Sequence, residues 1–121
     1  MCIAAALATL DVLEREGMAN AAKQGEAMMQ QVRGWMKKHK IIGDVRGRGL
    51  MIGVEIVKDQ ESREAAPALR DRIVDLAFER GLLILGCGEN SIRLAPPLIV
   101  NQHEVAVALE ILEECVGLSC Q

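Results

Sequence analysis

The chain has 121 residues, half of them apolar, and a net charge of -3 from 17 acidic and 14 basic side chains. No basic block is present, and one Trp, one Phe and no Tyr leave no aromatic platforms, which argues against nucleic acid and anionic membranes as partners. A chain of this length fits one domain, and its core must be aliphatic.

Two helices are predicted first. Residues 1–13 carry apolar side chains at the three-and-four spacing of one helix face. This segment is shorter than the roughly 20 residues that a membrane helix needs. It also has no capping residue at its start, so we expect it to be cut from a longer protein. Gly17 is expected to interrupt the helix, and a second one should run to the lysines that follow Trp35.

Strand patterns follow. Between residues 41 and 57 apolar residues alternate, with Leu50, Ile52, Val54 and Ile56 on one face. The glycines at 43, 47, 49 and 53 allow either two short strands joined by a turn near residues 47–49 or one bent strand. A third helix is expected from residue 66 to residue 77, ended by Arg80 and the C-cap glycine Gly81.

The last third of the chain predicts a hairpin and a helix. A strand at residues 82–85, a glycine-rich turn and a strand at residues 91–95 should form the hairpin, which Pro96 and Pro97 end. Asn101 and Glu104 have the spacing of a capping box, so a final helix should follow. The order of elements predicts an α+β fold, with a small antiparallel sheet packed against helices.

The residues alone indicate no active site. No serine or cysteine nucleophile has a recognisable base, and His103 is expected to be exposed near the start of the last helix. The glycine pairs at residues 47–49 and 86–88 lack the third glycine of a dinucleotide loop. Because the four cysteines have no metal-binding spacing, we expect reduced structural thiols and a cytoplasmic protein.

Arg93 is the residue of most chemical interest. A guanidinium grips a carboxylate through two parallel hydrogen bonds, and a short strand followed by two prolines would hold it still. The local pattern alone favours an ordinary solvent-facing strand arginine. Arg46 and Arg48 share a predicted strand face with Asp44, where exposed ion pairs of small energetic value are expected.

Three stretches of the sequence, residues 42–55, 81–83 and 91–98, closely resemble class III aminotransferases in order and separation. That family includes 4-aminobutyrate, ornithine and acetylornithine aminotransferases and dialkylglycine decarboxylase. The resemblance covers essentially the whole chain. It implies that residues 1–121 are the C-terminal small domain of a fold-type I enzyme that depends on pyridoxal 5'-phosphate (PLP), without the large domain that holds the cofactor.

The resemblance also implies a role for Arg93, which matches the family arginine that binds the substrate carboxylate. In the family reaction the cofactor forms a Schiff base with the donor amine while a lysine moves the proton. None of the five lysines here matches that lysine motif. We therefore expect the isolated chain to be inactive, and its parent to be a homodimer acting on amino and keto acids. The residues 85–88 favour 4-aminobutyrate as the amino donor.

Two alternatives stay open at the level of the sequence. A free-standing α+β module could bind an amino acid or mediate protein contacts. A chain with no function of its own, either excised from its parent or a relic of it, is the weaker alternative.

Overall fold

The computed structural model describes residues 1–120 and confirms the α+β prediction. Its single four-stranded sheet has the order β1-β2-β4-β3, and every neighbouring pair is antiparallel. The elements in chain order are α1 (Cys2–Val12), the π-helix η1 (Leu13–Gly17), α2 (Met18–Trp35), β1 (Ile42–Arg48), β2 (Met51–Ile56), α3 (Pro67–Glu79), β3 (Leu85–Cys87), β4 (Ser91–Leu94) and α4 (Gln102–Ser119).

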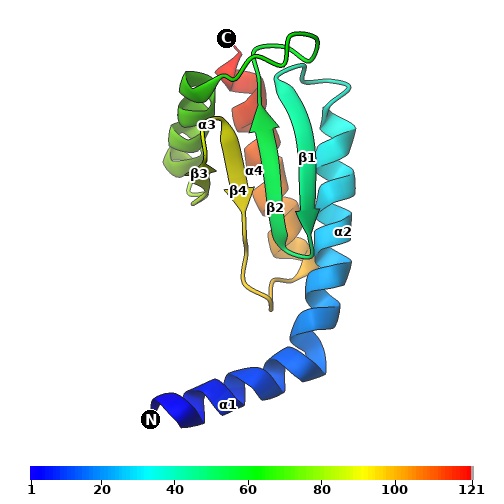
Figure 1. Cartoon of the computed structure of the whole chain (residues 1–121), viewed down its shortest axis with the longest axis vertical. Coiled ribbons are helices and arrows are strands. Elements are labelled where there is room, and N and C mark those ends of the chain that lie inside the picture. Colours follow the sequence, from blue (N-terminus) through cyan, green and yellow to red (C-terminus); the bar gives the residue numbers. More distant parts are fainter. Residues whose placement is uncertain (121) are drawn as a thin grey trace.

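The helices α2, α3 and α4 gather behind the sheet and leave its other face uncovered (Figure 1). The strand residues that face the helices are aliphatic and fully buried, as Ile52, Val54 and Ile92 illustrate. Val105, Leu109 and other apolar residues of α4 complete this core. The predicted alternation in residues 50–56 is confirmed, because every second side chain there is buried.

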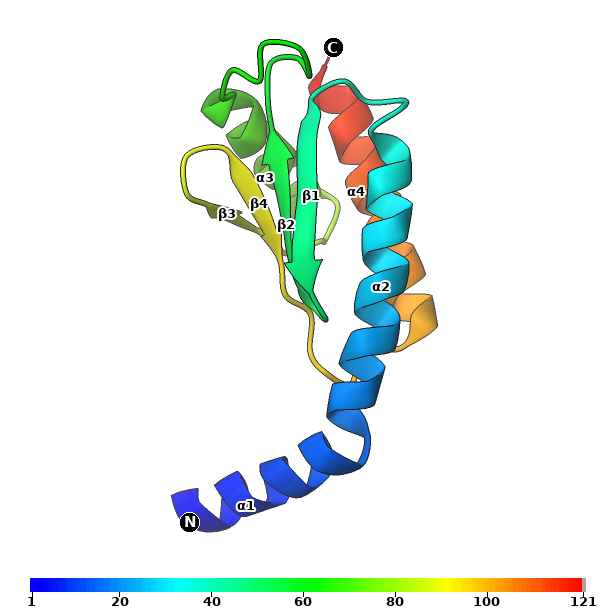
Figure 2. The same cartoon turned by 45° about the vertical axis from the view of Figure 1, so that its right-hand side comes forward.

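The predicted second helix is confirmed, because α2 begins at Met18 and ends at Trp35, but Gly17 does not end the helical conformation before it. The backbone stays helical through η1 and continues directly into α2, with a pronounced bend that makes α1 project from the body (Figures 1 and 2). A π-helical turn is a recognised cause of such a kink. Gly17 is buried within the bend, where a Cβ would lie 3.4 Å from Leu13 and 3.8 Å from Leu98. None of the residues of α1 is buried.

The segment at residues 41–57 forms two strands rather than one bent strand. The turn between β1 and β2 contains Gly49 with a φ of 55°, a conformation that favours glycine. This turn lies directly on α2, since a Cβ on Gly25 would be only 2.0 Å from the carbonyl oxygen of Gly49. The absence of a side chain at Gly25 therefore allows the helix and the turn to touch through their backbones.

The predicted strand at residues 82–85 is displaced, because β3 comprises Leu85–Cys87. Leu82 and Ile84 are partly buried against the core, whereas strand pairing begins only where Leu85 lies opposite Arg93. The other boundaries in this half agree well with the sequence. Gly81 follows α3 with a φ of 80°, and the capping box of Asn101 and Glu104 is present. No helix in residues 1–120 has the length and hydropathy required to span a membrane.

Candidate functional site

Arg93 lies on β4, in the interior of the sheet. Its backbone pairs with Gly53 of β2 on one side and with Leu85 of β3 on the other. Its neighbours Ile92 and Leu94 point into the buried core, so the Arg93 side chain emerges on the uncovered face. The sequence predicted this exposed strand position.

Two asparagines hold the segments on either side of β4. Before the strand, Asn90 donates from its side chain to the carbonyl of Ile56 at 2.7 Å. After the strand, Asn20 of α2 donates to the carbonyls of Leu98 and Val100 at 2.8 and 2.9 Å. Together with the strand pairing, these contacts fix the backbone that carries Arg93.

Arg70 of α3 packs against the β3–β4 hairpin, a contact that the sequence did not predict. A Cβ on Gly86 would lie 2.6 Å from Nη1 of Arg70, and the same nitrogen donates to the carbonyl of Gly88 at 3.5 Å. The Arg70 side chain is only 13% exposed and pairs with Asp71. Gly86 thus provides the space in which this arginine packs against the hairpin, and the glycine itself was the only sequence signal of this contact.

The guanidinium of Arg93 makes no hydrogen bond or ion pair with any other residue of the described chain, 1–120. Arg93 lines two cavities. One, of about 280 Å³, is bounded mainly by Leu82–Ile84, the residues that follow β4 and the α4 residues Leu109 and Leu112. The other, of about 300 Å³, lies over the uncovered face of the sheet. Arg93 therefore remains able to bind an anion from solvent.

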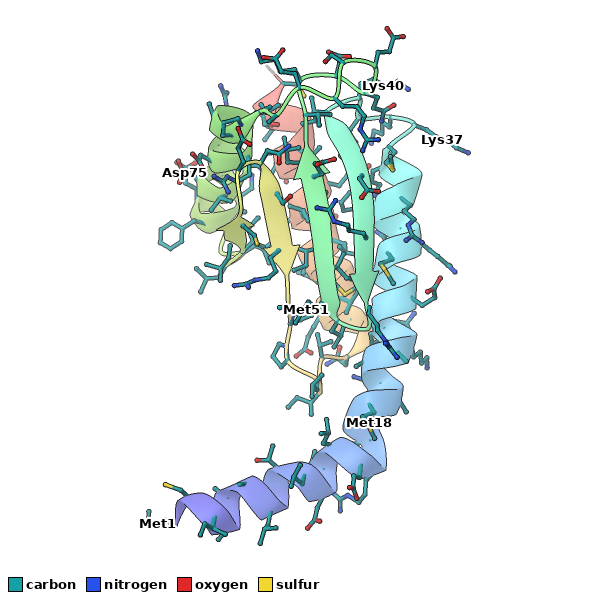
Figure 3. All side chains as sticks on the ribbon, in the orientation of Figure 1. Met1, Met18, Lys37, Lys40, Met51 and Asp75 are labelled. Carbon is teal, nitrogen blue, oxygen red and sulfur yellow. The ribbon has the colours of Figure 1, made fainter. Side chains whose placement is uncertain are left out.

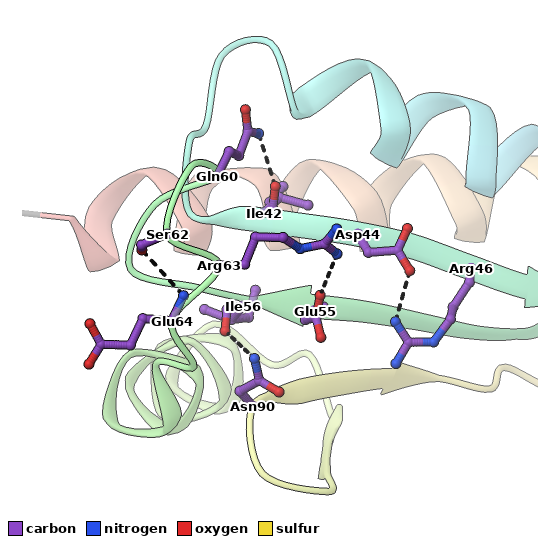
Figure 4. A network of polar contacts seen from close by, with 10 residues as sticks. All are labelled: Ile42, Asp44, Arg46, Glu55, Ile56, Gln60, Ser62, Arg63, Glu64 and Asn90. Atoms are coloured by element: carbon purple, nitrogen blue, oxygen red, sulfur yellow. Dashed lines mark hydrogen bonds and ion pairs between the residues drawn. The ribbon is translucent and has the colours of Figure 1, made fainter.

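Two arginine–carboxylate pairs also lie on the uncovered face (Figure 4). Nη1 of Arg46 donates to Asp44 at 2.8 Å, and Nη2 of Arg63 lies 3.4 Å from the Glu55 carboxylate. The hydrogen bond from Arg46 lowers the pKa of Asp44. The expected exposed ion pair between Arg46 and Asp44 is confirmed.

The histidines and cysteines form no second site among residues 1–120. His103 is exposed, as predicted, and His39 lies with its Nε2 3.6 Å from Oε1 of Glu113 at the opposite end of the domain from α1. Cys2, Cys87 and Cys120 are exposed. Cys115 is buried in the core, and burial raises the pKa of its thiol.

The described residues do not fit a PLP site. No lysine borders either cavity that Arg93 lines. Lys38 and Lys58 are paired with Glu113 and Glu64. Lys37 and Lys40 project into solvent at the end of the molecule away from α1 (Figure 3). Residues 1–120 therefore contain an unpaired arginine beside two cavities, and no lysine is placed there to bond a cofactor.

Comparison with known proteins identifies the family of this chain. The family model described as aminotransferase class-III matches residues 1–116. The chain belongs to the class III aminotransferase family. An alanine/serine racemase from Pyrococcus horikoshii is 43% identical over 116 residues, which are 93% of this chain and 24% of the relative. A 4-aminobutyrate aminotransferase from Mycobacterium leprae is 39% identical, over 94% of this chain and 26% of the relative.

Solved structures support the same family. An amine transaminase from an uncultivated Pseudomonas species, solved in its PLP-bound form, superposes with a TM-score of 0.88 and 37% identity. The match covers 96% of this class III chain and 27% of that structure. The chain thus spans about a quarter of the length of these relatives. These relatives include a racemase as well as aminotransferases, so the 4-aminobutyrate type stays a prediction.

Proposed function

We propose that this chain is the C-terminal small domain of a PLP-dependent class III aminotransferase, and that Arg93 binds the carboxylate of the amino-acid or keto-acid substrate. The observation that carries the proposal is an unpaired guanidinium on a strand that is paired on both sides, exposed on the uncovered face of the sheet. The family resemblance assigns a carboxylate to the same position.

The physical basis is preorganisation. A carboxylate accepts two parallel hydrogen bonds from a guanidinium, which makes this one of the stronger polar contacts in proteins. Because β4 pairs on both sides and Asn20 and Asn90 fix the flanking backbone, binding need order only the Arg93 side chain. A loop arginine would lose more conformational entropy on binding.

The proposal assigns the cofactor chemistry to a large domain outside this chain. When bound there, PLP would supply the electron sink for the transfer of an amino group from a donor such as 4-aminobutyrate to a 2-keto acid. The absence of a suitably placed lysine in the Arg93 cavities supports this division of labour. The isolated chain should then be inactive, whereas its parent would act as a cytoplasmic homodimer.

A chimera tests the proposal. This chain would replace the matching segment of the Mycobacterium leprae 4-aminobutyrate aminotransferase, to which it is 39% identical. In the chimera, Arg93→Ala should raise the KM for 4-aminobutyrate roughly 10- to 100-fold, the loss expected for a hydrogen bond to a charged group. The cofactor absorbance should not change.

The matched control is Arg72→Ala, which removes an exposed arginine from α3. It should leave the KM unchanged. An active chimera in which Arg93→Ala and Arg72→Ala give the same KM would remove Arg93 from the substrate site.

A further inference from the structure

The uncovered face of the sheet is hollowed between two arginines. The cavity of about 300 Å³ on this face is lined by Arg46 as well as Arg93, and Met51, Gly53 and Ser91 contribute to its floor and rim. Strand pairing places Arg46 opposite Gly53 and Gly53 opposite Arg93. The two arginines thus occupy one row across the sheet, separated by a single strand.

The hollow exists because the residue between the arginines is a glycine. A Cβ on Gly53 would meet only the carbonyl oxygen of Arg46, at 3.8 Å, so a side chain there would project into the open cavity. Neighbouring strands are about 4.8 Å apart, which separates the backbones of Arg46 and Arg93 by roughly 9 to 10 Å. A short molecule lying across Gly53 could therefore reach both guanidinium groups.

Arg46 is held toward this hollow while most of its donors remain available. Its Nη1 donates to Asp44 of the same strand at 2.8 Å, and its side chain is 61% exposed. Figure 4 shows the Arg46 side chain reaching from β1 across β2. A guanidinium has five N–H donors, so one bond to Asp44 orients Arg46 without exhausting its capacity.

The charges around the hollow favour an anionic ligand. Its two neighbouring carboxylates, Asp44 and Glu55, each have an arginine partner, in Arg46 and Arg63. Arg93 has no acidic partner in the part of the chain that the structure describes. The positive charge of Arg93 is therefore uncompensated, and a ligand with two acidic groups could neutralise it while sharing Arg46 with Asp44.

We propose that the hollow between Arg46 and Arg93 is a two-point site for a small dicarboxylate, with one carboxylate on Arg93 and the second on Arg46. This inference rests on the carboxylate role proposed for Arg93 and adds Arg46 as the group that selects diacids over monoacids. Gly53 permits the ligand to lie close to the sheet. The exposed side chain of Met51 offers an apolar contact for the carbon chain between the two acids.

The experiment titrates the 121-residue chain with glutarate and, separately, with butyrate, and follows backbone and arginine side-chain signals by NMR. Glutarate should bind more tightly than butyrate and shift the signals of Gly53, Arg46 and Arg93. Arg46→Ala should raise the Kd for glutarate about tenfold, as expected for one charge-assisted contact, and leave the Kd for butyrate unchanged.

Arg48→Ala is the matched control, because it removes an equal charge from the same strand and from a residue that does not line the hollow. It should leave the preference for glutarate intact. Gly53→Val should abolish that preference by filling the hollow. The dispersion of the spectra verifies that each variant is folded. Arg46→Lys keeps the positive charge but loses the planar guanidinium, so its Kd for glutarate should be intermediate.

Equal affinities for the two acids, or equal effects of Arg46→Ala and Arg48→Ala, would overturn the two-point site. So would the absence of signal changes with both acids. These outcomes do not test whether Arg93 binds the substrate of the parent enzyme. The KM of the chimera for 4-aminobutyrate tests that role separately. A chimera in which Arg93→Ala has no effect would instead refute the proposed function itself.

Discussion

The two faces of the sheet come from alternate residues of the same strands, yet they differ in almost every physical property. The face toward α3 and α4 presents Ile52, Val54 and Ile92, each with an exposed fraction of 3% or less. The other face presents arginines, carboxylates and Gly53 to solvent. Burial on one face supplies the stability that allows unpaired charge and an unfilled hollow on the other. Substitutions of adjacent residues should separate these two roles.

The largest contrast is expected between Ile92 and Arg93. Ile92→Ala would leave a cavity in a fully buried site and should lower the free energy of unfolding by about 2 to 5 kcal/mol. Arg93→Ala, one residue further along β4, should change it by no more than about 0.5 kcal/mol, because that side chain is exposed and unpaired. Urea denaturation measures both. A large loss from Arg93→Ala would mean that Arg93 serves the fold.

Two glycines of α2 allow a test of how this helix packs on the covered side of the domain. Gly25→Ala would place a Cβ within 2.0 Å of the backbone of Gly49, so it should destabilise the domain by about 1 to 3 kcal/mol. Gly34→Ala has no atom within 4 Å to meet and should stabilise the helix by about 0.5 to 1 kcal/mol. The melting temperature of each variant, measured by thermal unfolding, shows whether the substitution stabilises or destabilises the domain. Shifts of the same sign would contradict the close approach of α2 and the β1–β2 turn.

A smaller effect is expected at the start of α4, which covers the buried face. Asn101 accepts from the backbone of Glu104, and the Glu104 carboxylate accepts from the backbone of Asn101, each at 2.9 Å. Asn101→Ala should lower the free energy of unfolding by about 1 kcal/mol. Asn101→Asp keeps an acceptor and should retain most of the stability. Equal losses in the two variants would show that the cap is not the cause.

The smallest predicted effect is a pH dependence. A hydrogen bond from Lys38, 2.8 Å away, lowers the pKa of Glu113, with His39 adding to it. Since the unfolded chain then binds a proton more readily, this interaction stabilises the domain above the ordinary glutamate pKa and is lost as the pH falls through the lowered one. Both partners are partly exposed, so the gain is small.

Denaturation at neutral and acidic pH measures this contribution. Glu113→Gln should lose less stability on acidification than the unmodified chain. Glu110→Gln, an exposed residue of the same helix, is the control and should follow the unmodified chain. Identical pH profiles for all three would contradict the interaction with Lys38.

Most of the fold could be predicted because its signals are local. Alternation identified β2, the pair Asn101 and Glu104 marked the start of α4, and Gly81 marked the end of α3. The resemblance placed the chain in a family that the comparison confirms. The strand position and solvent exposure of Arg93 also followed from sequence, since each depends on its immediate neighbours.

The sequence-based predictions fail where contacts between residues far apart in the chain determine the structure. The sequence around Gly17 gives no sign that a π-helical turn keeps the helix continuous through a bend that packs near Leu98. The place of Arg70 under Gly86 and the bonds from Asn20 to Leu98 and Val100 likewise join residues far apart in the chain. Such contacts depend on the packing of whole elements, which local periodicity does not encode.

The most direct test of the account compares two amino donors in the chimera, 4-aminobutyrate and butylamine, which lacks the carboxylate. If Arg93 recognises the carboxylate, Arg93→Ala should lower the ratio of kcat/KM for 4-aminobutyrate over butylamine roughly 10- to 100-fold. Arg72→Ala should preserve the ratio. An unchanged ratio in Arg93→Ala would contradict the account, because the arginine would then not distinguish a donor that carries an acid from one that does not.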